Sequence, residues 1–336
     1  MSNEVADKVM TIHDVARELG VSASTVSRAI SGKGRIGEAT RKRILAYIEE
    51  HGFYPNAAAQ SLAQAKTNNI AIILPEVKTL VDIPFFHTCM YGVEEVAQAN
   101  DYDIIVVITS GKDTKNLERL ILNRKVDGMI LTRTYEDDFF AKFLRDHQVP
   151  FVAVGRTGGD DMLQVDHDNT GACRELVTVL FSKGIQRIAY LGSNMQQMVN
   201  ICRFEGYKDA FKKAKRQLDE DIIYTDLTSK TLVDKAVDEL LKKGADCILC
   251  QDDFICDEVV RKLARDGISI PDQMRVASCH YSRTLENFPV TITSLKFDIM
   301  ELGRRACQIL LDSINDKFVP DMTLLDYEII LKESTK

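Results

Sequence analysis

The sequence predicts a small all-helical module at the N-terminus, followed by two larger α/β lobes. The charge divides in the same way: residues 1 to 66 hold 9 basic and 7 acidic side chains, and the remainder holds 34 and 43. Apolar residues recur at helical spacing between residues 11 and 51, whereas strand-sized apolar runs alternate with helical patterns from Asn69 onward. A chain of 336 residues suits two or three domains, so its net charge of −7 averages over different modules.

The first 51 residues predict three short helices, the first two separated by a tight turn. Thr11 suits the N-cap of the first helix, Gly20 permits the turn, and Ser22 suits the N-cap of the second helix. The third helix is expected from Glu38 to His51. The side chains expected to face inward are Ile12, Val15, Ala16, Leu19, Val26, Ala29, Ile44, Leu45 and Ile48. This order of elements is the helix-turn-helix pattern that DNA-binding proteins use.

In such a module the second helix lies in the major groove, with its outer side chains against the base edges. That outer face is expected to carry Ala23, Ser24 and Arg28. Arg28 can donate two hydrogen bonds to guanine, Ala23 can touch a thymine methyl group, and Ser24 does not distinguish the bases. Other residues are better suited to contacts with the DNA phosphates: Thr25, Ser27, Ser31, Thr40 and the adjacent Arg41, Lys42 and Arg43. For the basic residues among them, a solvated helix face is the alternative.

Residues 54 to 66 predict a further helix with almost no apolar face. Pro55 ends the preceding helix, Asn56 can cap a new one, and the alanine-rich run from Ala57 to Ala65 favours helix. A helix of this length is marginal on its own in water. Its one large apolar residue, Leu62, has no obvious core to enter. A helix that pairs with its symmetry mate on DNA can insert such a residue into the minor groove as a wedge.

The same region resembles the DNA-binding headpiece of the lactose repressor (LacI/GalR) family of bacterial transcriptional regulators. The resemblance rests on the run from Thr11 to Ile30, then Thr40-Arg41, Gly52 to Asn56 and Ala59 to Leu62. It implies a dimer that binds a palindromic operator in double-stranded DNA, with Leu62 as the lever residue of a hinge helix at about residues 56 to 64. The loop around Gly34 differs among relatives, so the phosphate contacts there stay open.

Two other patterns suggest different chemistry but lie in the wrong setting. Gly32, Gly34 and Gly37 match a dinucleotide-binding glycine motif, yet they follow a helix rather than a buried strand, so a loop is the better interpretation. Cys247 and Cys250 have the C-x-x-C spacing of redox and zinc sites, but residues three apart in a strand face opposite sides. The eight cysteines are expected to be reduced, and no cofactor or metal is predicted.

Beyond the headpiece, the sequence predicts parallel strands with covering helices. The expected strands are residues 70–74, 104–108, 128–131 and 151–154, and the pattern restarts with 187–191, 222–224, 247–250 and 276–278. Amphipathic stretches such as 91–100 and 115–123 are the expected helices between them. A late helix at 300–314 and a last strand at 325–331 have no place in a simple consecutive order. This arrangement resembles the two-lobed periplasmic-binding-protein fold of the same family, in which the chain crosses between the lobes three times.

We place the three crossings near Gln164, Ser294 and Pro320. The expected domains are a headpiece with its hinge helix at residues 1–66 and a ligand-binding and dimerisation domain at residues 67–336. Within the second domain, the N-lobe comprises residues 67–163 plus 295–319, and the C-lobe comprises residues 164–294 plus 320–336.

A ligand in this fold binds in the cleft at the carboxyl ends of the strands. The resemblance implies that Arg203 and Asp253 contact the effector, and the fork of an arginine suits two hydroxyls or a carboxylate. A surface ion pair is the alternative for Arg203. The segment Asp166-His167-Asp168-Asn169 precedes the expected helix from Gly171 and supplies either cleft residues or only a helix cap. The family has an Asp-Asn pair here, so Asp168 is expected to contact or support the ligand. Phe85 and Phe86 form either an aromatic wall or only a helix start.

One part of the expected cleft departs from the family. After the strand at 276–278, relatives often continue with Gly-Phe-Asp-Asp, whereas this chain continues with Cys279, His280, Tyr281 and Ser282. His280 and Tyr281 either contact the effector or replace lost packing. Phe297 either lines the cleft or forms the joint between the lobes.

Together these observations predict a homodimeric transcriptional regulator, expected to be a repressor, whose affinity for DNA changes when a small molecule binds in the cleft. The resemblance implies a sugar or glycoside as effector; a purine, a phosphorylated metabolite and a partner protein are the alternatives. An enzyme is disfavoured, because the sequence has no phosphate loop, nucleophile elbow or metal-ligand spacing. The longest apolar runs are strand-sized and the N-terminus lacks the plan of a secretory signal, so a cytoplasmic protein without a membrane span is expected.

Overall fold

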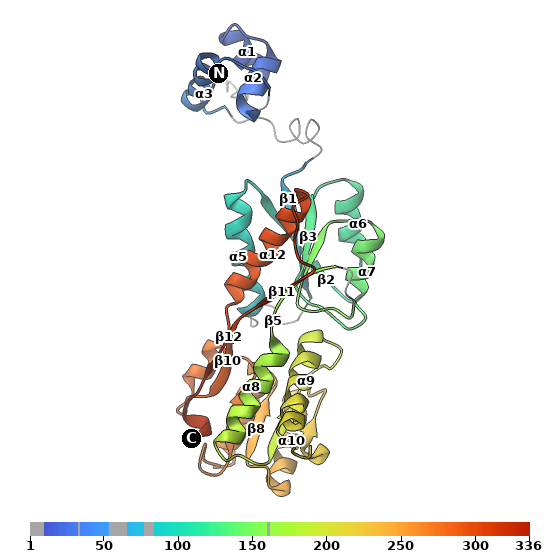
Figure 1. Cartoon of the computed structure of the whole chain (residues 1–336), viewed down its shortest axis with the longest axis vertical. Coiled ribbons are helices and arrows are strands. Elements are labelled where there is room, and N and C mark those ends of the chain that lie inside the picture. Colours follow the sequence, from blue (N-terminus) through green and yellow to red (C-terminus); the bar gives the residue numbers. More distant parts are fainter. Residues whose placement is uncertain (1–9, 33, 54–65, 77–83, 160–161) are drawn as a thin grey trace, which may run out of the picture. The chain divides into compact units, whose positions relative to one another are not determined.

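The computed structural model describes residues 10–32, 34–53, 66–76, 84–159 and 162–336 (Figure 1). The chain forms two compact units, Met1–Asn68 and Asn69–Lys336, each with its own hydrophobic core. The predicted hinge helix at residues 56–64, with Leu62, lies outside the described residues.

The first unit is the predicted three-helix headpiece, with α1 (Ile12–Glu18), α2 (Ala23–Ser31) and α3 (Glu38–Glu50). Thr11 and Asp14 exchange hydrogen bonds at the start of α1, and Ser22 accepts a hydrogen bond from the Thr25 amide at the start of α2. Gly20 has a φ of +61°, which gives the turn between α1 and α2 its left-handed residue. Val15, Ala16, Val26, Ala29, Ile44 and Phe53 form the core. The prediction for Leu45 is wrong, because its side chain is 41% exposed.

The N-lobe of the second unit is built on a six-stranded parallel sheet of order β11-β5-β4-β3-β1-β2. Its strands are β1 (Asn69–Pro75), β2 (Asp103–Thr109), β3 (Gly128–Leu131), β4 (Phe151–Val154), β5 (Leu163–His167) and β11 (Met322–Leu325). The helices α5 (Pro84–Ala99) and α12 (Ile299–Ile314) cover one face. The helices α6 (Lys115–Leu122) and α7 (Phe139–Asp146) cover the other. Figure 1 shows α5 and α12 side by side over the sheet, and they are in extensive contact.

The C-lobe repeats this plan with a sheet of order β12-β10-β9-β8-β6-β7, in which only β10 and β12 are antiparallel. Its strands are β6 (Ile188–Leu191), β7 (Ile223–Tyr224), β8 (Cys247–Cys250), β9 (Arg275–Ser278), β10 (Thr293–Phe297) and β12 (Tyr327–Ile330). The helices α8 (Asn169–Ser182) and α9 (Met198–Lys213) cover one face, and α10 (Lys230–Lys243) and α11 (Asp253–Arg265) cover the other. Short 3₁₀ helices lie at Glu220–Ile222, Arg283–Asn287 and Glu333–Thr335.

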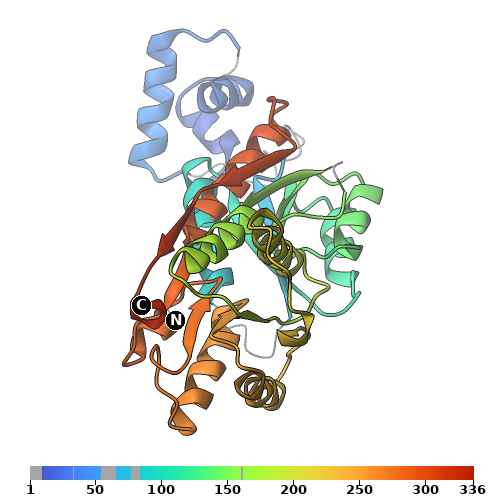
Figure 2. The same ribbon diagram turned by 60° about the horizontal axis from the view of Figure 1, so that its bottom comes forward.

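The chain crosses between the lobes after β5, after β10 and between β11 and β12, a few residues later than predicted each time. β5 therefore belongs to the N-lobe and β10 to the C-lobe. The single last strand predicted at 325–331 is wrong, because Asp326 separates two strands that lie in different sheets. Figure 2 shows this last segment, in red, running from one lobe to the other. Each crossing follows a completed strand, whereas Gln164 and Ser294 lie inside β5 and β10 and Pro320 precedes β11.

The cysteines in the described residues are free thiols buried in the lobes. Cys247 packs against α8 and α9, whereas Cys250 packs on the opposite face of the sheet, so the C-x-x-C pair does not converge on one point. Among the described helices, none combines the length and apolar character needed to cross a membrane.

Candidate DNA-binding face and effector pocket

The outer face of α2 presents one stripe of exposed polar side chains. Ser24, Ser27, Arg28 and Ser31 are exposed and lie at i, i+3, i+4 and i+7, opposite the buried Val26 and Ala29 of the same helix. Ala23 and Thr25 are half-buried: Ala23 packs against the headpiece core, and the Thr25 hydroxyl lies 2.8 Å from the Ser22 hydroxyl. The structure therefore gives Arg28 and three serines the exposed positions on this helix.

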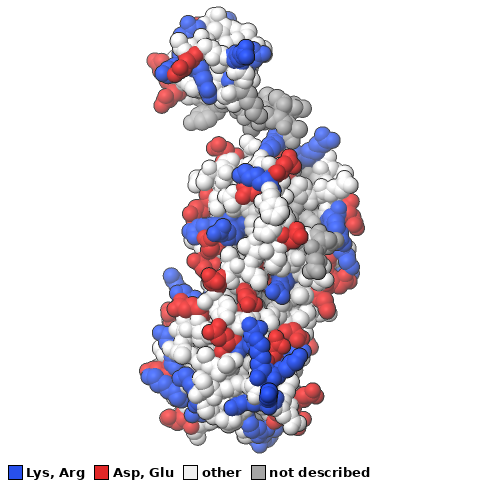
Figure 3. Space-filling model, viewed as in Figure 1, with Lys and Arg blue, Asp and Glu red and all other residues white. Residues whose placement is uncertain are grey.

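The basic residues predicted near phosphates have different surroundings. Arg43 donates to the Leu19 carbonyl at the end of α1, at 2.8 Å, so this side chain caps a helix as well as carrying charge. Lys42 forms an exposed ion pair with Glu38, at 3.3 Å, and Thr40 is half-buried. Figure 3 shows basic side chains at several places on the headpiece, whereas both signs are interspersed over the lobes.

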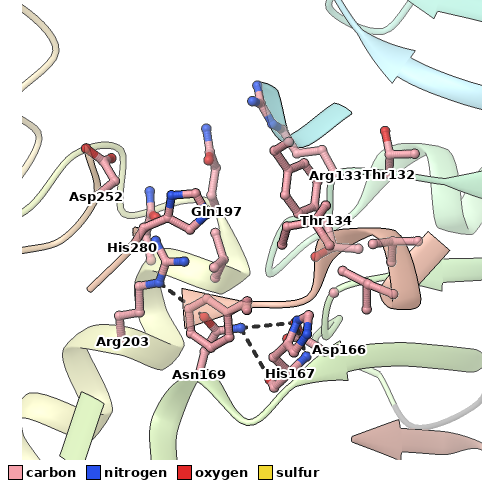
Figure 4. A pocket seen from close by; sticks show the side chains of 18 of the residues that line it. Thr132, Arg133, Thr134, Asp166, His167, Asn169, Gln197, Arg203, Asp252 and His280 are labelled. Carbon is pink, nitrogen blue, oxygen red and sulfur yellow. Dashed lines mark hydrogen bonds between the residues drawn. The ribbon is translucent and has the colours of Figure 1, made fainter. Parts of the chain in front are cut away.

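A cavity of about 240 Å³ lies between the N-lobe and the C-lobe, at the carboxyl ends of strands from both sheets. Its polar lining includes Thr132, Arg133, Thr134, Asp166, His167, Asn169, Gln197, Asn200, Arg203, Asp252, Asp253 and His280, and its aromatic lining is Phe85, Phe86, Phe254 and Phe297. Figure 4 shows Arg203, His280 and Asp252 on one side, Arg133 with the two threonines on the other, and Asp166 and His167 beside Asn169.

Arg203 is held by C-lobe acceptors at this cavity, and one of them, Asn169, also bonds to the N-lobe. Its Nε donates to Asn169 Oδ1 at 3.1 Å, and its Nη1 donates to the Gln251 carbonyl at 3.0 Å. Asn169 in turn donates to Asp166 Oδ1 of the N-lobe at 3.0 Å. Arg203 is 7% exposed, and its acceptors in this network are the Asn169 side chain and the Gln251 carbonyl. A buried arginine held by neutral acceptors keeps hydrogen-bonding capacity for a ligand.

The N-lobe side of the cavity holds two buried titratable groups with shifted pKa values. Burial raises the pKa of Asp166 to about 6, against the opposing effects of the His167 amide and the Arg203 charge. Burial lowers the pKa of His167 to about 4, so this imidazole is neutral near pH 7. Asp166 and His167 are the last two residues of β5.

The C-lobe side holds an acidic residue with the opposite shift. Burial acts to raise the pKa of Asp253, but the hydrogen bond and charge of His280 lower it to about 2. His280 Nδ1 lies 3.3 Å from Asp253 Oδ1. Asp252 is the N-cap of α11, where its side chain accepts from the Ile255 amide at 2.8 Å. The carboxylate of Asp253, the first residue of α11, is therefore ionised over the physiological pH range.

Aromatic rings form two walls of the cavity. Phe86 is buried and packs in the N-lobe core, with the Arg133 guanidinium 5.0 Å from its ring centroid. Phe297, at the end of β10, lies 4.9 Å from the His167 ring, and Arg203 lies 5.8 Å from the Phe297 centroid. The cavity therefore combines apolar faces with donors and acceptors at its edges, as binding sites for small polar molecules do.

Of the seven residues predicted to bind the effector, five line this cavity: Phe85, Phe86, Arg203, Asp253 and Phe297. The other two lie elsewhere. Asp168 is the N-cap of α8 and accepts from the Gly171 amide at 2.9 Å, and the Tyr281 hydroxyl donates to Glu286 at 2.7 Å. In the structure, Asp168 therefore has the alternative role, that of a helix cap.

The sequence pointed to the segment from Asp166 to Asn169 but gave weight only to Asp168, and it missed Arg133 altogether. Asp166 and Asp168 are two residues apart, and the sequence does not show which lies on the strand and which begins the helix. The available signal was the polar pair Asp166-His167 directly after Val165. Arg133 likewise follows the apolar strand β3, where a charged residue is informative.

Comparison with known protein families shows which family the chain belongs to. The family described as periplasmic binding proteins and sugar binding domain of LacI family matches residues 67–326, more than half of the chain. The bacterial regulatory proteins of the lacI family match residues 11–56. The chain belongs to the LacI family.

This LacI-family protein is similar to individual regulators over almost its whole length. It is 31% identical to the HTH-type transcriptional regulator MalR of Streptococcus pneumoniae serotype 4, covering 91% of this chain and 93% of MalR. It is 28% identical to the HTH-type transcriptional regulator CelR of Thermobifida fusca, covering 96% and 98%. A solved structure of the transcriptional regulator CelR in complex with cellobiose matches with a TM-score of 0.74 and 25% identity, covering 97% and 99%.

The lac repressor dimer bound to operator and the anti-inducer ONPF shares the fold, with a TM-score of 0.80, 19% identity and coverage of 98% and 99%. Family membership and these relatives make the chain a DNA-binding transcriptional regulator and not an enzyme. Among the described residues, no cluster of three or more histidine, cysteine or acidic side chains is arranged to hold a metal ion.

Proposed function

We propose that this LacI-family protein is a dimeric repressor that binds a palindromic operator and responds to a sugar in the cavity between its lobes. The observation that carries the proposal is the convergence of Arg203 and Asp253 from the C-lobe with Asp166 from the N-lobe on one cavity. A donor fork and carboxylates around aromatic walls suit a hydroxyl-rich molecule. The MalR and CelR relatives, and the cellobiose complex of CelR, support a sugar of this kind.

Backbone hydrogen bonds between the lobes provide a physical route for the response. The Met198 amide donates to the Thr134 carbonyl at 3.1 Å, and the Glu136 amide donates to the Gln196 carbonyl at 3.3 Å. Thr134 and Gln197 also line the cavity. A sugar that binds better to one lobe arrangement than to another shifts the balance between them, and operator binding then changes by reciprocal linkage.

An exposed apolar strip on the N-lobe supports dimer formation through this lobe. Val106 and Ile108 project from the edge strand β2 and are 48% and 53% exposed, and Tyr91 of α5 is 59% exposed. Ile104 of the same strand packs against the core on the α5 side, so its alternate neighbours Val106 and Ile108 face the same way. A second copy of the chain is the occupant we propose, in line with the dimeric lac repressor of the same fold.

The full-length chain tests this proposal directly. Selection of binding sites from random DNA is expected to yield a palindrome, and sedimentation is expected to give a dimer at the concentrations used. Calorimetry with D-glucose, maltose and cellobiose is then expected to find at least one ligand, which changes operator affinity. A selected site without two-fold symmetry would contradict the palindrome, whereas failure of every sugar to bind would contradict only the effector class.

Arg28→Ala is expected to relax discrimination at one base pair in each half-site, because a bidentate contact to guanine contributes about 1–3 kcal/mol of discrimination. Competition binding with operators substituted at single positions measures this. Ser27→Ala on the same exposed stripe is the matched control, and it should weaken all operators alike. A uniform loss for Arg28→Ala would instead identify Arg28 as a phosphate contact.

Leu62→Ala is expected to reduce operator affinity at least about tenfold while leaving sugar binding unchanged, because alanine is too short to act as a minor-groove wedge. Fluorescence anisotropy on the selected palindrome gives the operator affinity, and calorimetry gives the sugar affinity. Ala63→Ser, the neighbouring position, is the control. Equal operator affinity for Leu62→Ala and the wild type would contradict the wedge.

A further inference from the structure

Two glycines in the loop between α2 and α3 have arginine side chains directly against them. Gly32 and Gly34 both have left-handed φ angles, of +68° and +86°. A Cβ atom at Gly34 would lie 3.3 Å from Arg28 Cδ and 3.5 Å from Arg28 Cγ and Nε. A Cβ atom at Gly32 would lie 3.0 Å from Arg41 Nη2. The glycines that resemble a nucleotide motif therefore leave room for one arginine from α2 and one from α3.

The guanidinium of Arg28 has no polar partner within the part of the chain that the structure describes. Arg28 is exposed, and no hydrogen bond or ion pair of its side chain is formed there. Two other headpiece arginines differ: Arg17 pairs with Asp14 at 2.8 Å, and Arg43 donates to a carbonyl at the end of α1. The stem of Arg28 is thus placed by packing on Gly34, and the donors of its fork stay available for DNA.

Packing of the stem affects how well Arg28 can read a base. A long exposed side chain loses rotamer freedom when it binds, and this loss reduces the affinity gained from the contact. A stem that already lies along Gly34 has less freedom to lose. Carbon atoms pack best at about 3.5–4.0 Å, so a side chain at position 34 would push the Arg28 stem away from its present place.

Resting on the proposed function, we propose that Gly34 is a positioning residue for Arg28. Because Gly34 has no side chain, the Arg28 stem lies on the loop, and the fork is held ready for the base pair that it reads. Gly34 acts through Arg28 and makes no base contact of its own. A left-handed backbone by itself also favours glycine, so the experiment has to separate the contact from the turn.

The experiment compares Gly34→Asn with Gly52→Asn in the full-length protein. Asparagine tolerates the left-handed region better than most residues. Gly52 has a φ of +58°, and a Cβ atom there would have no neighbour within 4 Å, so both variants carry a similar backbone demand but only Gly34→Asn meets Arg28. Competition binding measures the affinity ratio between the selected palindrome and one changed at the base pair that Arg28 reads.

Gly34→Asn is expected to reduce this ratio about three- to tenfold, the range that corresponds to ordering one long side chain. Gly52→Asn should stay within about twofold of the wild type. In an Arg28→Ala background, Gly34→Asn should leave the ratio unchanged, because its effect passes through Arg28. The same loss in both backgrounds would overturn the proposal, since position 34 would then act on the DNA or the turn directly. Equal ratios for Gly34→Asn and Gly52→Asn would overturn it too.

A measurement on the wild type does not depend on whether Gly34→Asn folds. Nitrogen-15 relaxation of the arginine Nε groups, with Arg28 assigned through Arg28→Ala, reports their mobility without DNA. Arg28 Nε should be more restricted than Arg35 Nε, because Arg35 is exposed in the same loop and has no polar partner among the described residues. Equal mobility of the two groups would overturn the proposed positioning.

The outcomes also distinguish this inference from the proposed function. Arg28-dependent discrimination on a palindrome, without coupling to Gly34, would overturn only the positioning role and leave the repressor standing. A uniform loss of affinity for Arg28→Ala on all operators would contradict base reading by Arg28, and the positioning role would fall with it.

Discussion

Arg203→Lys is expected to weaken the binding of a sugar effector about a hundredfold, because lysine keeps the charge but loses the planar fork. In the wild type, Nε and Nη1 are held by Asn169 and Gln251, which orients the rest of the guanidinium at the cavity. Hydrogen bonds to charged groups contribute about 1.5–3 kcal/mol each, and every 1.4 kcal/mol is about a tenfold change in affinity. Calorimetry with whichever of glucose, maltose or cellobiose binds the wild type measures the effect.

Arg261→Lys is the matched control, since Arg261 lies exposed on α11 and pairs with Asp257 away from the cavity. Arg203→Lys also leaves the Asn169 and Gln251 acceptors imperfectly paired, so the C-lobe should lose about 1–3 kcal/mol of stability. Affinities are therefore compared well below the melting temperature of the variant. Unchanged sugar affinity together with lowered stability would show that Arg203 only holds the C-lobe together.

Gly303→Ala is expected to destabilise the second unit by about 3 kcal/mol or more through overpacking between α5 and α12. A Cβ atom at Gly303 would lie 2.1 Å from the Cys89 carbonyl oxygen, and one at Gly92 would lie 2.0 Å from the Met300 carbonyl oxygen. Each glycine thus meets the backbone of the opposite helix, and backbone cannot turn away as a flexible side chain can. The two helices must separate to accept even one methyl group.

Urea unfolding followed by circular dichroism measures this change, with Gln98→Ala on the exposed side of α5 as the control. The control should shift the free energy of unfolding by no more than about 0.5 kcal/mol. Because the headpiece and the lobes are separate units, a transition confined to the lobes is the one to compare. Equal midpoints for Gly303→Ala and the wild type would show that α5 and α12 are not packed this closely.

Much of the local structure could be predicted from the sequence because it depends on neighbouring residues. The caps Thr11 and Ser22 begin α1 and α2 as predicted, since a side-chain oxygen satisfies amides only a few residues away. The uninterrupted apolar run at 70–74 lies in a strand because a central parallel strand is covered on both faces. The run at 104–108 also forms a strand, but it lies at the sheet edge, where Val106 and Ile108 stay exposed. Leu45 shows the limit, because helical spacing does not say how wide the buried stripe is.

The parts of the site that escaped prediction depend on where a strand ends and which sheet it joins. Asp166 and Asp168 are equally polar, but β5 extends to His167, so Asp166 lies on the strand and Asp168 caps the next helix. The run from 325 to 331 is interrupted only by Asp326 and Glu328, and nothing local indicates that the strands before and after Asp326 pair with different sheets. Those pairings are formed with strands thirty or more residues away.

By itself, the sequence determined the helix-turn-helix headpiece, the alternation of strands and helices, and the residue types that suit a polar ligand. These follow from propensity, capping and periodicity, which act over a few residues. Only the tertiary structure decided that Asp166, His167, Asn169 and Arg203 share one cavity, and that Asp168 and Tyr281 do not line it. The physical reason is that the cavity forms where the ends of six strands from two sheets converge, and that convergence is fixed by topology rather than by any local pattern.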